Sequence, residues 1–147
     1  MPPVDTFEAH LEYVKKFKKA VLLVAGAAAQ KLMQSLAKEQ EVLMHIADMM
    51  IWTYTAESLV LRVQKLAGQR GEDAVAHEMA MMKVYCYEVA ERMHSAGKEA
   101  LLAFAEGDEL KGMLMGLKRF TKTEPFNTTA ARQSIALKLI EEGKYCW

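Results

Sequence analysis

Carboxylate and histidine side chains at helical spacing are the groups in this chain that could bind a metal ion. Residues 91–94, Glu-Arg-Met-His, form one Glu-x-x-His motif, and Glu41 and His45 form a second pair four residues apart. A di-iron centre in a helical bundle needs a Glu-x-x-His from each of two helices and a glutamate from each of two others. The chain has one such motif, and His94 lies one step off the apolar row of its segment. The sequence therefore argues against a metal centre.

Glu57 is a carboxylate that lies among apolar neighbours at helical spacing, with Tyr54 one turn before it. The row that contains both is Leu43, Ala47, Met50, Tyr54, Glu57, Leu61 and Gln64. A carboxylate buried in such a row must be paired or protonated. We expect Glu57 to be buried beside Tyr54, as a structural ion pair or a tyrosine hydrogen bond, with a catalytic base as the alternative.

The remaining reactive side chains do not form a recognisable catalytic pattern. Cys86 belongs to an apolar row and is expected to be a buried apolar residue rather than a nucleophile. His10 and His77 are expected at the surface. The chain has no G-x-S-x-G, no G-x-G-x-x-G and no P-loop. We therefore assign no catalytic, cofactor-binding or metal-binding residue.

The segment 38–66 contains no glycine and no proline, and it predicts a helix. Beside the row of Glu57 it carries a second apolar row. This second row is Val42, Ile46, Met49, Thr53, Ala56, Val60 and Val63. Two adjacent apolar rows make a wide face, which predicts the central helix of a bundle.

Four further helices are predicted around this one, at 5–34, 72–106, 109–121 and 129–142. A single helix over 5–67 would be about 95 Å long, so we place a turn near 34–37. A second turn is expected at 68–71, Gly-Gln-Arg-Gly. No segment alternates as a strand does. The prediction is an all-α, up-and-down bundle similar to a four-helix bundle, with an additional short C-terminal helix, in one domain over 1–147.

Charge and cysteine content limit the classes of partner. Nineteen basic and nineteen acidic residues cancel, so no net basic field favours nucleic acid. The two cysteines form no closely spaced framework, which favours a reducing compartment and predicts a cytoplasmic protein. The apolar run 20–29 is half the length needed to cross a bilayer. Basic residues bracket it, and they form a candidate membrane or interface patch: Lys15, Lys16, Lys18, Lys19 and Lys31.

Two segments of the chain resemble a known protein family. KEQEVLMHIADMMIWTYTAESLVLR at 38–62 and EMAMMKVYCYEVAERM at 78–93 resemble the C-terminal part of acyl-CoA dehydrogenases. The likeness is to the long members, which carry an additional helical region after their catalytic domains. It covers about 20–140. The residues that match the pattern of those members are Glu39, Gln40, Leu43, Ile46, Ala47, Asp48, Ile51, Tyr54 and Arg62.

The resemblance implies a helical bundle and a parent enzyme that dehydrogenates acyl-CoA with FAD. The family's flavin-contacting Q-x-x-G-G-x-G segment should follow the third helix, but residues 95–100 are SAGKEA, without a double glycine. The chain also has no counterpart of the family's N-terminal helical and middle β domains. We expect no cofactor in this chain itself, and FAD in the parent enzyme.

Three hypotheses follow. The first is a non-catalytic C-terminal domain, part of a longer chain, that docks on the catalytic domains of that chain, supports a homo-oligomer, or both. The second is a module that binds a membrane surface through its lysines. The third is a stand-alone ligand-binding or enzymatic bundle, with Glu57 and Tyr54 lining a pocket.

Overall fold

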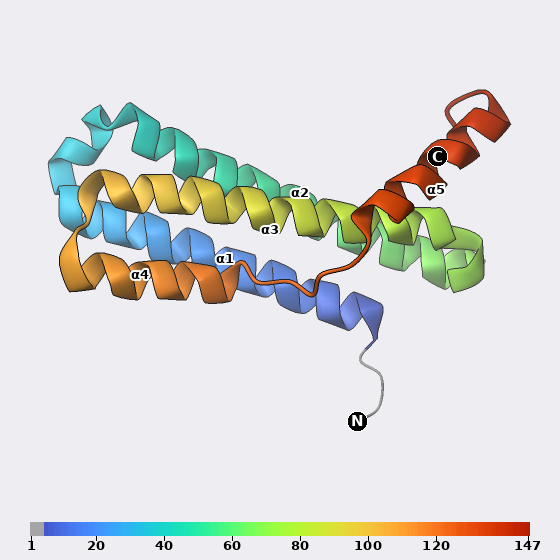
Figure 1. The fold of residues 1–147 in the computed structure, drawn as a ribbon, viewed down its shortest axis with the longest axis horizontal. Helices are drawn as coiled ribbons and strands as arrows, with labels where there is room; N and C mark the ends of the chain where they lie inside the picture. The colour runs from blue at the N-terminus through green and yellow to red at the C-terminus, as the bar shows by residue number, and fades with distance from the viewer. Residues whose placement is uncertain (1–4) are drawn as a thin grey trace.

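Five α-helices make up the computed structural model, which describes residues 5–147 (Figure 1). The bounds are α1 (Thr6–Leu32), α2 (Gln40–Arg70), α3 (Ala76–Phe104), α4 (Gly107–Phe120) and α5 (Thr128–Glu142). Helices α1 to α4 run alternately in opposite directions, and α5 crosses α3 and projects from the side of the bundle, towards the end that holds the α2–α3 turn (Figure 1). No strand occurs in the described range. The prediction of an all-α bundle with an additional C-terminal helix is confirmed.

The predicted turns between the helices are present. The Asp5 side chain accepts a hydrogen bond from the Phe7 N–H at 3.2 Å and caps α1. A 3-10 helix over Met33–Lys38 separates α1 from α2 and contains the turn placed near 34–37. Gly71, with φ of 86°, ends α2 in a conformation that suits glycine, and a second 3-10 helix, Glu72–Val75, leads into α3.

One of the two apolar rows of α2 forms the core. The second row, together with Ala67, makes up all the buried residues of α2: Val42, Ile46, Met49, Thr53, Ala56, Val60, Val63 and Ala67. The row that contains Tyr54 and Glu57 is half-buried or exposed. The expectation that α2 is the central helix is wrong, because α2 packs on α1 and α3 whereas α3 contacts each of the other four helices.

Helix α1 contributes one face to the same core. Together with the 3-10 helix that follows, it is long and apolar enough to cross a membrane by length and composition. In the bundle, however, its Phe17, Ala20 and Val24 are completely buried against other helices. One face of α1 is therefore part of the bundle core, and 22% of its most apolar window is buried.

A glycine on α3 sets how closely α4 approaches. A Cβ atom added at Gly97 would lie 2.8 Å from Leu117 Cδ1 and 3.3 Å from Met49 Cε. Leu117 is the buried residue of α4, and it occupies the space above this glycine. At Gly26 on α1, by contrast, an added Cβ meets nothing within 4 Å.

We predict that the two glycines respond to alanine in opposite directions. Gly97→Ala overpacks the contact with Leu117 and should lower the free energy of unfolding by about 1–3 kcal/mol. Gly26→Ala should raise it by about 0.4–1 kcal/mol, because alanine restricts the unfolded chain at no steric cost. Urea unfolding measures both. Equal effects at the two positions would contradict the close approach of α3 and α4.

Candidate functional site

A groove between α1 and α2 brings together the polar residues singled out in the sequence. Its volume is about 400 Å³. The lining residues are Lys18, Val21, Leu22, Met50, Thr53, Tyr54 and Glu57. Glu57 and Tyr54 therefore do line a common groove, but its walls are mainly apolar and it is open to solvent along its length.

The expected burial of Glu57 is wrong, whereas the expected ion pair is present. The Glu57 side chain is 35% exposed and forms an ion pair with Lys18, which is 56% exposed. Tyr54 is 76% exposed. The reason is the rotation of α2: its neighbouring row, with Thr53, faces the core, so the row of Glu57 faces outward. An ion pair this exposed contributes about 0–1 kcal/mol.

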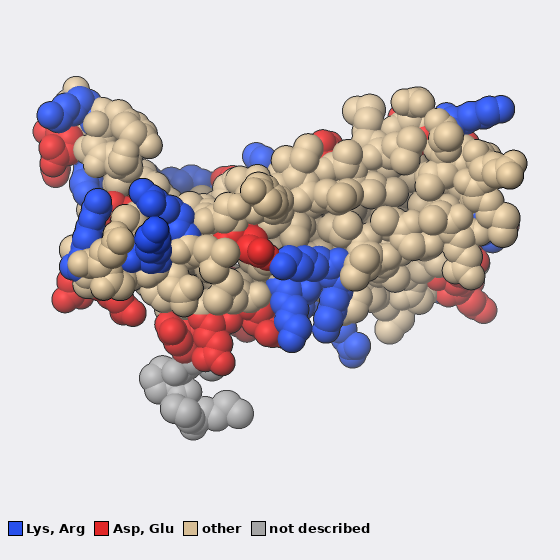
Figure 2. Space-filling model, turned by 180° about the vertical axis from the view of Figure 1, so that it is seen from behind, with Lys and Arg blue, Asp and Glu red and all other residues tan. Residues whose placement is uncertain are grey.

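The rim of the groove continues into a broad apolar surface. Figure 2 shows a wide area without charged side chains over the C-terminal half of α1 and the N-terminal half of α2. The large apolar residues exposed on these two segments are Leu22, Met44, Met50 and Ile51. We call Leu22, Met50, Ile51, Tyr54 and Met44 the α1–α2 face. A contiguous exposed apolar surface marks a site of interaction with another apolar surface.

The lysine patch borders this face only in part. Lys15, Lys18, Lys19 and Lys31 are exposed and Lys16 is half-buried. Figure 2 shows a group of basic side chains beside the apolar area. Two of the five lysines are engaged in ion pairs, Lys18 with Glu57 and Lys31 with Glu109 on α4 at 3.5 Å.

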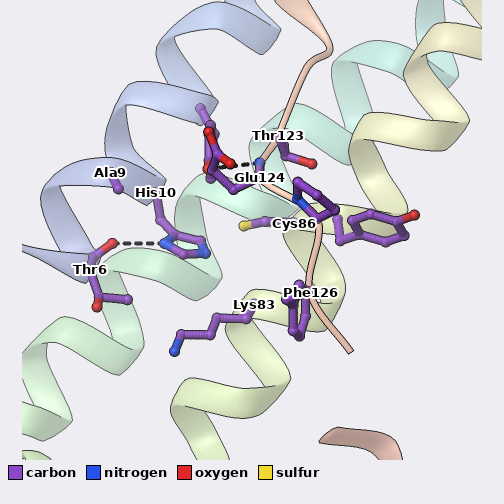
Figure 3. A pocket seen from close by; sticks show the side chains of 11 residues that line it. Thr6, Ala9, His10, Lys83, Cys86, Thr123, Glu124 and Phe126 are labelled. Carbon is purple, nitrogen blue, oxygen red and sulfur yellow. Dashed lines mark hydrogen bonds between the residues drawn. The ribbon is translucent and has the colours of Figure 1, made fainter. Parts of the chain in front are cut away.

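A second, smaller cavity lies where the loop before α5 crosses α1 and α3 (Figure 3). It has a volume of about 260 Å³. Thr6, His10 and Tyr13 of α1, Lys83 and Cys86 of α3, and Thr123 to Phe126 of the loop line it. The Tyr13 hydroxyl accepts a hydrogen bond from the Glu124 N–H at 3.1 Å and holds the loop in place.

His10 is buried in this cavity wall, so its predicted surface position is wrong. It continues the buried spacing of Phe7, Val14 and Phe17, which is the signal that could have placed it. Its Nδ1 lies 2.7 Å from the Thr6 carbonyl oxygen, one turn earlier. Burial lowers the pKa of His10, the hydrogen bond to Thr6 raises it, and the nearby Lys83 ammonium lowers it; the net direction is down.

Cys86 faces the same cavity, yet the two residues do not make a nucleophile and base pair. Burial raises the pKa of the Cys86 thiol to about 12, so the thiol stays protonated at neutral pH. A cysteine nucleophile needs the opposite, a lowered pKa. The prediction that Cys86 is a buried apolar residue is confirmed.

The Glu-x-x-His motif lies at the surface of α3. Glu91 is exposed, and His94 is half-buried with its Nδ1 at 3.4 Å from the Thr121 hydroxyl. Glu41 is also exposed. Within residues 5–147 no three His, Cys, Asp or Glu side chains converge on a point that could hold a metal ion.

With this geometry established, comparison with known proteins defines the class of the chain. A sequence model of the acyl-CoA dehydrogenase C-terminal domain matches residues 16–119, which is most of the bundle. The chain belongs to this family.

Two individual proteins are similar to nearly the whole of this chain. The chain is 33% identical over 144 residues to a probable acyl-CoA dehydrogenase of Bacillus subtilis, with 98% of this chain and 24% of that protein covered. It also superposes with a TM-score of 0.93 on the crystal structure of an acyl-CoA dehydrogenase complexed with FAD from Bacillus anthracis. That match has 34% identity and covers 100% of this chain and 26% of the other. The chain thus spans about a quarter of the length of the relatives that it matches.

The burial of His10 predicts a pH-dependent stability. Its pKa is lower in the folded protein than the unfolded value of 6.5, so the unfolded chain binds more protons as pH falls through about 6.5. The free energy of unfolding should therefore fall as pH decreases below about 7 and should recover as pH rises. His10→Asn, which keeps a donor near the Thr6 carbonyl, should reduce this slope. Urea titrations between about pH 5 and 8 measure it.

The matched control is Gln30→Asn at an exposed position of the same helix, which removes no ionisable group. It should leave the slope as in the unmodified protein. An unchanged slope in His10→Asn, or an equal loss in both variants, would show that His10 does not carry the effect.

Proposed function

We propose that this chain is the C-terminal helical domain of a flavin-dependent acyl-CoA dehydrogenase in the cytoplasm, and that its work is to dock on the catalytic part of the same polypeptide. The observation that carries the proposal is the exposed apolar α1–α2 face. Its row on α2 repeats at helical spacing like the buried row beside it, yet Met50 and Tyr54 in this row are largely exposed in the part of the chain that the structure describes.

The occupant of this face is argued from chain length. Each relative has about three-quarters of its chain outside the part that matches this domain. A polypeptide of that size, tied to the bundle covalently, is present at a high effective concentration beside the α1–α2 face. Exposed apolar rows such as this one are the expected counterpart of such a neighbour.

The electrostatics of the bundle also support a role without chemistry of its own. Two titratable side chains that are buried within residues 5–147, His10 and Cys86, have pKa values shifted towards their uncharged forms. The Lys18–Glu57 pair in the groove is exposed rather than poised against a substrate cavity. We infer that flavin and acyl-CoA are bound by the remainder of the enzyme.

Charged substitutions on the face test the docking role in the full-length enzyme. Met50→Glu with Tyr54→Glu should weaken docking by about 3 kcal/mol or more, because two side chains lose their apolar partner. Small-angle scattering should then show a larger radius of gyration while flavin stays bound. The control is Met115→Glu, at an exposed methionine of α4.

An unchanged radius of gyration in the double variant would refute the proposal, as would the same increase in Met115→Glu. A fall in molecular mass without undocking would assign the face to a second copy of the chain, and dimerisation would replace docking as its role.

A second candidate function is association with a membrane surface. It is favoured by exposed Lys15 and Lys19, which lie on the same helix as exposed Leu22. A basic edge beside an apolar surface suits an anionic bilayer. The enzyme should then co-sediment with vesicles that contain anionic lipid at low salt, and Lys15→Glu with Lys19→Glu should release it. No pelleting with anionic vesicles would remove this candidate.

A further inference from the structure

Helix α5 is attached to the bundle on one side only. It packs on α3 and on no other helix of the described range 5–147. Every residue of Thr128–Glu142 is described, and none of them is buried. Figure 1 shows α5 leaving the bundle at the end where α1 begins. A helix so placed depends on a small contact or on a partner elsewhere.

The contact with α3 uses one side of α5. The half-buried residues of α5 are Thr128, Ala131, Ile135 and Lys138, spaced by three and four. On this side Arg132 also pairs with Glu88 of α3 at 2.5 Å. These contacts account for about one face of the helix.

A different side of α5 presents large apolar side chains to solvent. Leu137 is 58% and Ile140 is 73% exposed. They are three residues apart and therefore share a face. Between Arg132 and Glu141 the one charged residue is Lys138, which is half-buried and lies 5.6 Å from the Trp147 ring centre. A helix that is apolar on two sides is expected to lie between two partners, and the bundle supplies one.

The exposed side of α5 is held in a fixed position. The Asn127 side chain accepts a hydrogen bond from the Ala130 N–H at 3.0 Å and caps the helix. The preceding loop is anchored through the Glu124 contact to Tyr13 and by Phe126, whose ring meets Tyr87 edge-on at 6.0 Å. A rigidly mounted apolar surface binds with a smaller loss of conformational entropy than a mobile one.

We propose that α5, with loop 121–127, is a docking arm that grips the catalytic part of the same polypeptide through Leu137 and Ile140. This rests on the proposed function, and it adds a second contact surface separate from the α1–α2 face. Its occupant is the portion of the enzyme chain that lies outside these 147 residues.

Two observations favour this occupant. The superposition on the FAD-complexed enzyme covers the whole chain, α5 included, and about three-quarters of that enzyme lies outside the match and is available as a neighbour. In addition, a polypeptide that joins the bundle at the start of α1 arrives beside the loop that carries α5, because Tyr13 of α1 bonds to that loop.

The size of the arm argues against a second copy as the occupant. Fifteen residues make a helix about 22 Å long, and one side of it offers on the order of 350 Å². A stable interface between separate molecules buries about 800 Å² on each partner. A neighbour in the same chain needs less area, because a covalent link replaces much of the cost of association.

Limited trypsin digestion of the full-length enzyme tests the arm, because Arg132 and Lys138 offer cleavage sites in α5. In the docked enzyme these sites are protected. Leu137→Glu with Ile140→Glu should raise their cleavage rate by about tenfold or more, since cleavage follows the population of the open state. Leu137→Met with Ile140→Leu should keep the slow rate.

The control is Leu102→Glu, at a half-exposed leucine at the opposite end of α3. It should leave cleavage in α5 unchanged. Equal cleavage rates in the unmodified enzyme and the double glutamate variant would overturn the proposal, as would an equal increase in Leu102→Glu.

Molecular mass by sedimentation separates the remaining outcomes. An unchanged mass together with faster cleavage supports docking within one chain, whereas a halved mass would assign the arm to a second copy and overturn the proposal. If the Met50 and Tyr54 variant undocks the bundle while the α5 variants behave like the unmodified enzyme, the arm alone is refuted. If neither the Met50 and Tyr54 variant nor the α5 variants have an effect, both the arm and the proposed docking function are refuted.

Discussion

The packing of one row of α2 against α1 and α3 fixes the rotation of that helix, and the accessible chemistry of the bundle depends on this rotation. Thr53 lies in the middle of the row. Its hydroxyl donates a hydrogen bond to the Met49 carbonyl at 2.8 Å, and its oxygen lies 3.4 Å from Met93 Sδ of α3. With Thr53 directed inward, Glu57 and Tyr54 follow at about 40° and 100° around the axis. Glu57 therefore reaches the edge of the groove, and Tyr54 faces solvent.

Helix positions and the direction of the chain were predictable from the sequence, because apolar spacing and turn residues encode them locally. Which of the two rows of α2 faces the core was not predictable. Both rows repeat at three and four residues, and both contain large apolar side chains. Apolar residues at helical spacing occur on every helix face that becomes buried, whether against the bundle itself or against a neighbouring protein surface. The burial assigned to Glu57 was an error of this kind.

Two further features depend on tertiary packing that spacing does not specify. His10 is polar, but it occupies a core position because the Thr6 carbonyl, one turn earlier, provides a partner for its ring. Gly97 resembles any other helical glycine in the sequence, yet it lies under Leu117 of α4. The packing role of that glycine becomes apparent only once the crossing of α3 and α4 is known.

Membership of the family is stronger evidence for the fold of this chain than for its chemistry. A bundle can keep its packing rows without retaining a cofactor site, because packing needs only apolar volume at the right spacing whereas a site needs specific groups in a specific geometry. Here the buried titratable groups, His10 and Cys86, favour their uncharged forms, and the ion pairs are at the rims. This distribution suits the scaffold role that we propose.

The two exposed apolar surfaces differ in a way that suits one tethered neighbour. The α1–α2 face is broad and belongs to the core helices, whereas α5 is narrow and stands at the edge of the bundle. Neither surface has to hold a free partner if the neighbour is in the same chain, since the tether keeps its concentration high. Docking at two separated places also fixes orientation, because one contact leaves rotation free and a second removes it.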